Sequence, residues 1–116
     1  MNVYDAAHQL ARALKGSPEY QEVKRLQKKV NEDESTKRMY EDFRSQELSY
    51  QMKRMSGEEP SAEEIERLQQ TFEVIRLNPD VAQLLAAEQR FTIMLDDMNR
   101  IIGEALQQLD PHFQPD

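Results

Sequence analysis

The feature that most constrains the fold is a run of apolar residues between Pro79 and Leu109, near the C-terminal end. Its members follow one another at alternating spacings of three and four residues. This 3.5-residue repeat is typical of a helix whose apolar stripe lies along another helix. The stripe, called the seam below, consists of Val81, Leu84, Glu88, Phe91, Leu95, Met98, Ile102, Ala105 and Leu109.

The length of this run limits how the chain can cover it. A helix from Pro79 to Leu109 would be about 46 Å long at a rise of roughly 1.5 Å per residue. A compact domain of this size has a diameter of about 28 Å. The seam therefore needs cover either from other helices of the same chain or from a second copy, and the sequence leaves both open.

Glu88 is the one polar member of the seam. Polar residues at such positions commonly set the register and the number of associating helices. One hypothesis pairs Glu88 with a basic residue, which could be Arg90 of a partner, Arg12 or Arg100. The other hypothesis ends the bundle near Phe91 and leaves Glu88 beside water. In either case we predict that the oligomer or partner interface consists of Leu84, Glu88, Phe91, Leu95, Met98 and Ile102.

Turn and capping signals predict four further helices before the seam helix. Gly16 is expected to end the first helix in the left-handed conformation. The later helices are preceded by side chains suited to N-caps, namely Ser17, Asp33, Ser61 and Asn78. The expected helices run from about Val3 to Gly16, Pro18 to Asn31, Glu34 to Met55, Ser61 through Ile75, and Pro79 to Leu109.

These elements predict an all-α fold. We expect a helical bundle of about five helices, in which the third and fourth form an antiparallel hairpin and the last is a long C-terminal helix. No stretch alternates with period two over a length that would indicate a strand. Residues 1–110 are predicted to form a single helical domain, followed by a short C-terminal tail over residues 111–116.

Composition narrows the class of protein. The 116 residues carry a formal net charge of −7, which argues against direct binding to nucleic-acid phosphates. The absence of Cys removes disulfide and thiolate chemistry and fits a reducing compartment. The longest unbroken apolar run, residues 84–87, is far shorter than the roughly 18 residues of a membrane span. With no signal-peptide pattern at the start, we expect a soluble cytoplasmic protein without membrane insertion.

The residues predict no catalytic site, no cofactor and no metal, so we expect a protein that is not an enzyme. Asp5 and His8 form a single D-x-x-H pair, whereas a di-metal bundle uses two E-x-x-H motifs and two further carboxylates. The acidic residues around 58–66 and the basic run over 24–29 are read as solvated helix surface. The alternative is a metal- or small-molecule-binding helical bundle that uses Asp5, His8 and the acidic cluster.

Two blocks of the sequence resemble a known family. The block from Val30 to Arg44, VNEDESTKRMYEDFR, resembles the central block of the YlbF/YmcA family of small bacterial helical proteins. The residues Pro79 to Leu84, with AEQRF after Ala86, are similar to its second hallmark. The helix layout is similar along nearly the whole chain, and the YheA-like branch, known from Bacillus, matches best.

The resemblance implies an oligomeric, non-enzymatic and cytoplasmic protein, a homodimer or a higher homo-oligomer. Relatives in this family act as partners in a complex that regulates sporulation, competence and biofilm development. That complex is also associated with endoribonuclease Y and with messenger-RNA maturation. The complex is associated with cysteine-ligated iron–sulfur clusters. Because this chain has no Cys, the resemblance carries over no cluster. A protein partner in a regulatory complex is the expectation that follows.

Overall fold

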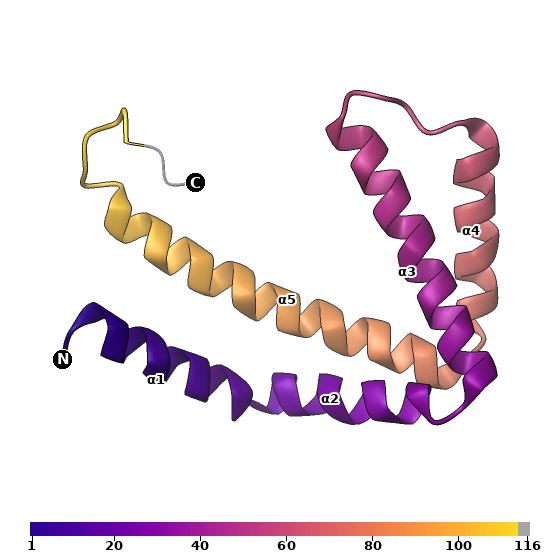
Figure 1. Ribbon diagram of the computed structural model, residues 1–116, viewed down its shortest axis with the longest axis horizontal. Helices are drawn as coiled ribbons and strands as arrows, with labels where there is room; N and C mark the ends of the chain where they lie inside the picture. Colours follow the sequence, from indigo (N-terminus) through magenta and orange to yellow (C-terminus); the bar gives the residue numbers. More distant parts are fainter. Residues whose placement is uncertain (114–116) are drawn as a thin grey trace.

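The computed structural model describes residues 1–113 and contains five helices (Figure 1). They are α1 (Val3–Lys15), α2 (Pro18–Asn31), α3 (Glu34–Met55), α4 (Ala62–Arg76) and α5 (Pro79–Leu106). No strand occurs within the described residues, so the predicted all-α fold is confirmed. In the same part of the chain, no helix is both long enough and apolar enough to cross a membrane.

The predicted N-caps are present. Ser17 accepts a hydrogen bond from the backbone N–H of Tyr20, and Asp33 accepts one from Thr36. Asn78 likewise caps α5 by accepting from two N–H groups of its first turn. Each bond satisfies a donor that has no partner inside the helix. The helix starts therefore follow from local side-chain chemistry.

The N-cap predicted at Ser61 is present, but among the described residues the reciprocal bond from the Ser61 N–H to Glu64 that would complete a capping box is not. Ser61 accepts from the backbone N–H of Glu64 at 3.1 Å. The Glu64 carboxylate, however, is engaged by the ammonium group of Lys53 in α3. This ion pair ties the start of α4 to the end of α3 and lowers the pKa of Glu64, mainly through the hydrogen bond from Lys53.

Two predicted helix ends need correction. Gly16 has φ −85° and ψ −4°, which is right-handed, because Ser17 caps the next helix immediately and no reversal of direction is needed. The residue with positive φ is Gly57, at 83°, in the turn between α3 and α4. The helix α5 ends at Leu106 rather than Leu109, since no side chain extends it and Pro111 disfavours helical backbone before it.

The helices form two arms that meet at one end of α5 (Figure 1). The long arm consists of α1, α2 and α5, with α2 packed along the first half of α5. The hairpin arm is the antiparallel pair α3 and α4, as predicted. The molecule extends over 47 × 37 × 16 Å with a radius of gyration of 18.2 Å. A compact chain of this length would have a radius of gyration of about 13.4 Å.

The core occupies the junction of the two arms. Its buried side chains come from four helices and are Leu26, Val30, Phe43, Ile75, Val81, Leu84 and Ala87. Away from this junction, each helix has a neighbour on one side at most. The outer ends of both arms therefore expose apolar side chains that the chain itself does not cover.

Candidate interaction surface

The inner half of the seam is covered within the chain. Leu84 is 0% exposed and packs in the core with Val81 from the same helix and Leu26 from α2. The predicted interface residue Leu84 is therefore placed in the core at the junction of the arms.

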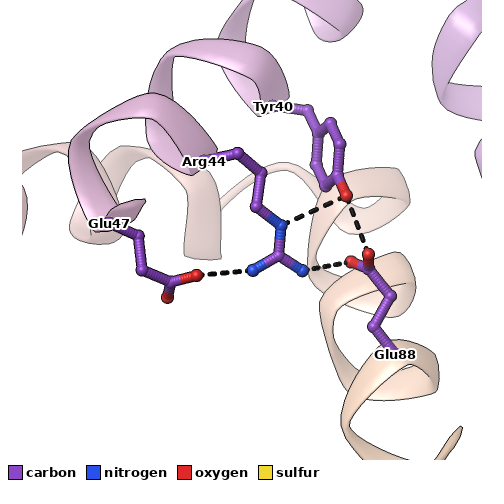
Figure 2. Close-up of polar contacts among 4 residues, drawn as sticks. All are labelled: Tyr40, Arg44, Glu47 and Glu88. Carbon is purple, nitrogen blue, oxygen red and sulfur yellow. Dashed lines mark hydrogen bonds and ion pairs between the residues drawn. The ribbon is translucent and has the colours of Figure 1, made fainter. Parts of the chain in front are cut away.

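Glu88, the polar member of the seam, closes the core toward the hairpin arm. Its carboxylate accepts a hydrogen bond from the Tyr40 hydroxyl at 2.8 Å and pairs with the Arg44 guanidinium at 2.5 Å (Figure 2). Arg44 also donates to Tyr40 and forms an ion pair with Glu47 at 2.6 Å. Both Tyr40 and Arg44 lie on α3, so the network joins α3 to α5.

The partner of Glu88 within the chain is not one of those predicted. The expectation of a basic partner is confirmed, but the residue is Arg44 rather than Arg12 or Arg100. The alternative, in which Glu88 only faces water, is wrong because its side chain is 21% exposed and bonded on both oxygens. Tyr40 and Arg44 follow each other at i and i+4, a spacing that places both on one helix face.

The surroundings of the network shift two pKa values. Burial raises the pKa of the Tyr40 hydroxyl, and the neighbouring Glu88 carboxylate raises it further, against the opposing effect of Arg44. Desolvation lowers the pKa of Arg44, but its hydrogen bonds to Tyr40 and Glu88 outweigh this and raise the pKa above its ordinary value. Arg44 therefore stays charged, and the network links two helices rather than offering a titrating catalytic group.

Beyond Glu88 the seam residues are less buried than Leu84. Phe91 is half-buried and meets the ring of Tyr20 edge-on, with the ring centroids 5.9 Å apart. Leu95 and Met98 are half-buried as well, and Ile102 is 52% exposed. Phe91 is thus the last predicted interface residue with an aromatic contact to α2, and three of the six, Leu95, Met98 and Ile102, lie along the outer half of α5.

Helix α1 adds a second uncovered apolar face, which is separate from this outer half. No Cα atom of α1 lies within 8 Å of one in α5, and α1 packs only on α2 among the described helices. None of its side chains is buried, and Val3 is 81% exposed. The apolar residues of α1 share one face at helical spacing. They are Val3, Ala6, Ala7, Leu10, Ala11 and Leu14.

Together these residues define the open face, which comprises the apolar face of α1 and the outer half of the seam. Such a face can bind another helix, because this association buries apolar area and needs no reactive group. Asp5 and His8 lie exposed on α1. Among the described residues, no three His, Asp or Glu side chains are placed to hold a metal ion.

Sequence reasoning missed two features of this arrangement, the network around Glu88 and the role of α1. It did not place Tyr40, Arg44 or Glu47 around Glu88, although the four-residue spacing of Tyr40 and Arg44 was visible. It also did not assign the face of α1 to an interface. The apolar stripe of α1 was a usable signal, since a 13-residue helix that packs on little else needs cover from elsewhere.

Comparison with known proteins gives one consistent result. The family model Com_YlbF, described as control of competence regulator ComK, YlbF/YmcA, matches residues 3–107. The UPF0342 protein YheA of Bacillus subtilis is 41% identical over 109 residues, which are 94% of this chain and 93% of that protein.

Solved structures agree with the sequence matches. A protein of unknown function (DUF964) from Bacillus stearothermophilus superposes with a TM-score of 0.81 at 29% identity, covering 97% of this chain and 98% of that one. A chain from the crystal structure of Bacillus subtilis RicA in complex with RicF superposes with a TM-score of 0.62 at 26% identity, covering 91% and 94%.

Proposed function

Because the chain belongs to the YlbF/YmcA family, we propose that it is a non-enzymatic helical interaction protein that works as a homo-oligomer in a regulatory complex. The open face is the surface through which two copies associate. The observation that carries this proposal is the amount of surface that a single chain leaves uncovered.

The accessible surface can be compared with that of ordinary monomers. The chain has a mass of 13.6 kDa and an accessible surface of 9280 Å². A folded monomer of this mass exposes about 6,600 Å², so the excess is about 2,700 Å². Obligate dimers remove roughly 1,000–2,500 Å² from each partner. The excess lies slightly above the upper end of this range, so the uncovered surface is large enough for a permanent homodimer interface.

The charges beside the open face support pairing between two copies. Helix α1 carries Arg12 and Lys15, and within the described residues neither forms an ion pair. The outer half of α5 carries the carboxylates Asp96, Asp97 and Glu104, of which Asp97 and Glu104 also pair with Arg100 of the same helix across exposed side chains. If α1 of one copy lies along α5 of the other, basic and acidic residues meet twice by symmetry. Such complementarity fixes orientation more than it adds affinity.

The regulatory part of the proposal rests on relatives. The matched family is described by its control of a competence regulator, and a similar fold is found in the RicA–RicF complex. By this likeness we assign the chain a cytoplasmic role alongside a protein partner in sporulation, competence, biofilm development or RNA maturation. Helix faces that bind other helices are sufficient for such a role.

The mass of the protein in solution tests the oligomer. Sedimentation velocity of the intact protein is expected to give a mass of two or more chains. Leu95→Asp places a carboxylate in the middle of the open face and should give single chains of 13.6 kDa. Gln89→Asp, on the exposed polar side of the same helix, is the matched control and should remain assembled.

Thermal unfolding by circular dichroism must show that both variants are folded. A Leu95→Asp variant that stays both folded and assembled would contradict the interface. Crosslinked co-purification from the native bacterium tests the regulatory part. Recovery of endoribonuclease Y or of sporulation and competence proteins with the intact chain supports it, whereas recovery of the chain alone contradicts it.

A further inference from the structure

A second surface lies on the hairpin arm and shares no residue with the open face. It is a groove of about 690 Å³ along α4 that reaches Phe43 in α3. Phe72 forms its centre and is 46% exposed, and Leu68 lies one turn earlier on α4. The ring of Phe72 rests against Phe43, whose centroid is 6.1 Å away, so the ring is held in place. We call this surface the hairpin groove.

The hairpin groove is acidic at its edges. Three glutamates line it, Glu47 from α3 and Glu66 and Glu73 from α4, and within the described chain no lysine or arginine lines it. Glu47 shares Arg44 with Glu88, so two carboxylates are balanced by one guanidinium. Among residues 1–113, the one side-chain group that donates to Glu66 is the Gln70 amide, at 3.4 Å, which adds no positive charge.

The ion pair between Glu73 and Arg76 does little to reduce the negative charge at the edges of the groove. Both side chains are more than 60% exposed, and exposed pairs of this kind contribute little free energy. An incoming basic group can therefore compete for Glu73. The groove thus combines an exposed aromatic centre with a rim of negative charge.

From this combination we propose that the hairpin groove binds a basic amphipathic helix of another protein. Apolar residues at i, i+3 or i+4 of that helix would cover Phe72 and Leu68, while its Lys or Arg residues meet Glu47, Glu66 and Glu73. Helix α4 is 15 residues long, or about 22 Å, so it offers room for about four turns of a partner helix.

Charge argues against a second copy as the occupant. The chain has a formal net charge of −7, so a copy that approaches the acidic rim is repelled overall. Its basic helix α2 has Leu26 and Val30 buried in its own core and presents no free apolar stripe. The apolar face of α1 and the outer half of α5 of a second copy are already used by the open face in the proposed function.

A synthetic peptide provides the probe. We would use a fluorescein-labelled peptide of about 18 residues built from Leu and Lys, with Leu on one helical face. A peptide of the same composition with scrambled order is the matched control, because it keeps the charge but loses the apolar face. Fluorescence anisotropy with the full-length protein is expected to show tighter binding of the patterned peptide and weakening with added salt.

Two variants locate the binding site. Phe72→Ala should weaken binding of the patterned peptide by about tenfold, as expected for an aromatic side chain at the centre of an interface. Glu66→Lys leaves the aromatic centre intact and should weaken binding by at least about threefold. Glu41→Lys makes the same charge change on the exposed side of α3, outside the groove, and should leave binding unchanged.

Each outcome bears on the proposal. Equal binding of patterned and scrambled peptides, or equal loss in Glu66→Lys and Glu41→Lys, would show attraction to net charge alone and overturn it. A Phe72→Ala variant that is folded but reduced in oligomeric mass would show that a second copy occupies the groove, which also overturns it. Loss of peptide binding with an unchanged oligomeric mass supports it.

Discussion

The two halves of α5 carry the same seven-residue pattern but lie in different surroundings. In the inner half, Leu84 is 0% exposed beneath α2 and the hairpin arm, and Glu88 is held by Tyr40 and Arg44. In the outer half, Ile102 is 52% exposed. A heptad pattern thus specifies that a stripe will be covered by a helix, but not which chain provides that helix.

The difference arises from the lengths of the neighbouring helices. Helix α2 has 14 residues against 28 in α5, so it covers about half of the longer helix. Helix α1 precedes α2, with Gly16 between them, and it diverges from α5 and packs on α2 alone among the described helices. The inner half therefore stabilises the single chain, and the outer half is left largely uncovered by it.

The largest expected effect comes from truncating the inner half. Leu84→Ala removes a fully buried side chain and should lower the free energy of unfolding by about 3 kcal/mol, within the range of buried Leu truncations. Urea denaturation followed by circular dichroism measures this change. The matched truncation Ile102→Ala should leave the monomer within about 0.5 kcal/mol of the original.

The same pair of variants separates folding from association. In a Leu95→Asp background, where the chains should stay apart, Leu84→Ala should lower the free energy of unfolding and Ile102→Ala should leave it nearly unchanged. In the assembled protein, Ile102→Ala should instead raise the protein concentration needed for association. Equal loss of monomer stability in both variants would contradict the division of α5 into two halves.

A smaller effect is expected from the network around Glu88. Arg44→Met leaves the Glu88 carboxylate without its ion pair in a site that is only 21% exposed, which should cost about 1–2 kcal/mol. Replacing both partners, with Glu88→Leu added, should cost less than the sum of the single changes because no carboxylate is left unpaired.

A double-mutant cycle on urea denaturation gives the coupling between these residues. Oligomeric mass should be unchanged in all three variants, since the network joins two helices of one chain. Strictly additive losses would contradict the contact between Arg44 and Glu88. A change in mass would mean that Glu88 also contributes to association.

The smallest expected effect is a dependence on acid pH at the junction. The pKa of Asp33 lies below its ordinary value of 3.8, chiefly because Thr36 donates a side-chain hydrogen bond to it and a backbone bond as well. A depressed pKa gives stability that is present above the unfolded-state pKa and is lost as pH falls through the folded-state pKa. The difference in the free energy of unfolding between the original protein and Asp33→Asn should therefore become smaller as the pH falls below about 4.

Asp110 provides the comparison at the outer end. Its pKa is also lowered, mainly by the backbone N–H of His112 and then by the His112 side chain. The turn that contains it lies on the exposed surface and can open without unfolding the core. Asp110→Asn should leave the acid dependence of thermal unfolding unchanged, and a shift equal to that of Asp33→Asn would contradict the comparison.

How much of this could be predicted from the sequence depends on whether the cause is local. The helix starts at Ser17, Asp33 and Asn78 depend on side chains within a few residues of the N–H groups they bind, so they were predicted correctly. The end of α5 was placed three residues too late because no capping side chain marks it. The partner of Glu88 lies 44 residues away on α3, and no local pattern gives the angle between α3 and α5.

The hairpin groove shows a second limit. The spacings of three, four and three residues place Ile65, Leu68, Phe72 and Ile75 on one apolar face of α4. Only Ile75 is buried, because it lies at the junction, whereas Phe72 lies further along an arm that has no third helix to cover it. Spacing identifies an apolar face, but the number of helices that cover it is a property of the whole fold.

The most direct test of the open face is amide hydrogen exchange measured at several protein concentrations. A 13-residue helix that packs on little else is marginal in water, so α1 should exchange rapidly in single chains. Association through the open face should slow exchange in α1 and in the outer half of α5 as concentration rises, and Leu95→Asp should abolish this slowing. Exchange in α1 that is independent of concentration, or slowing that persists in Leu95→Asp, would contradict the account.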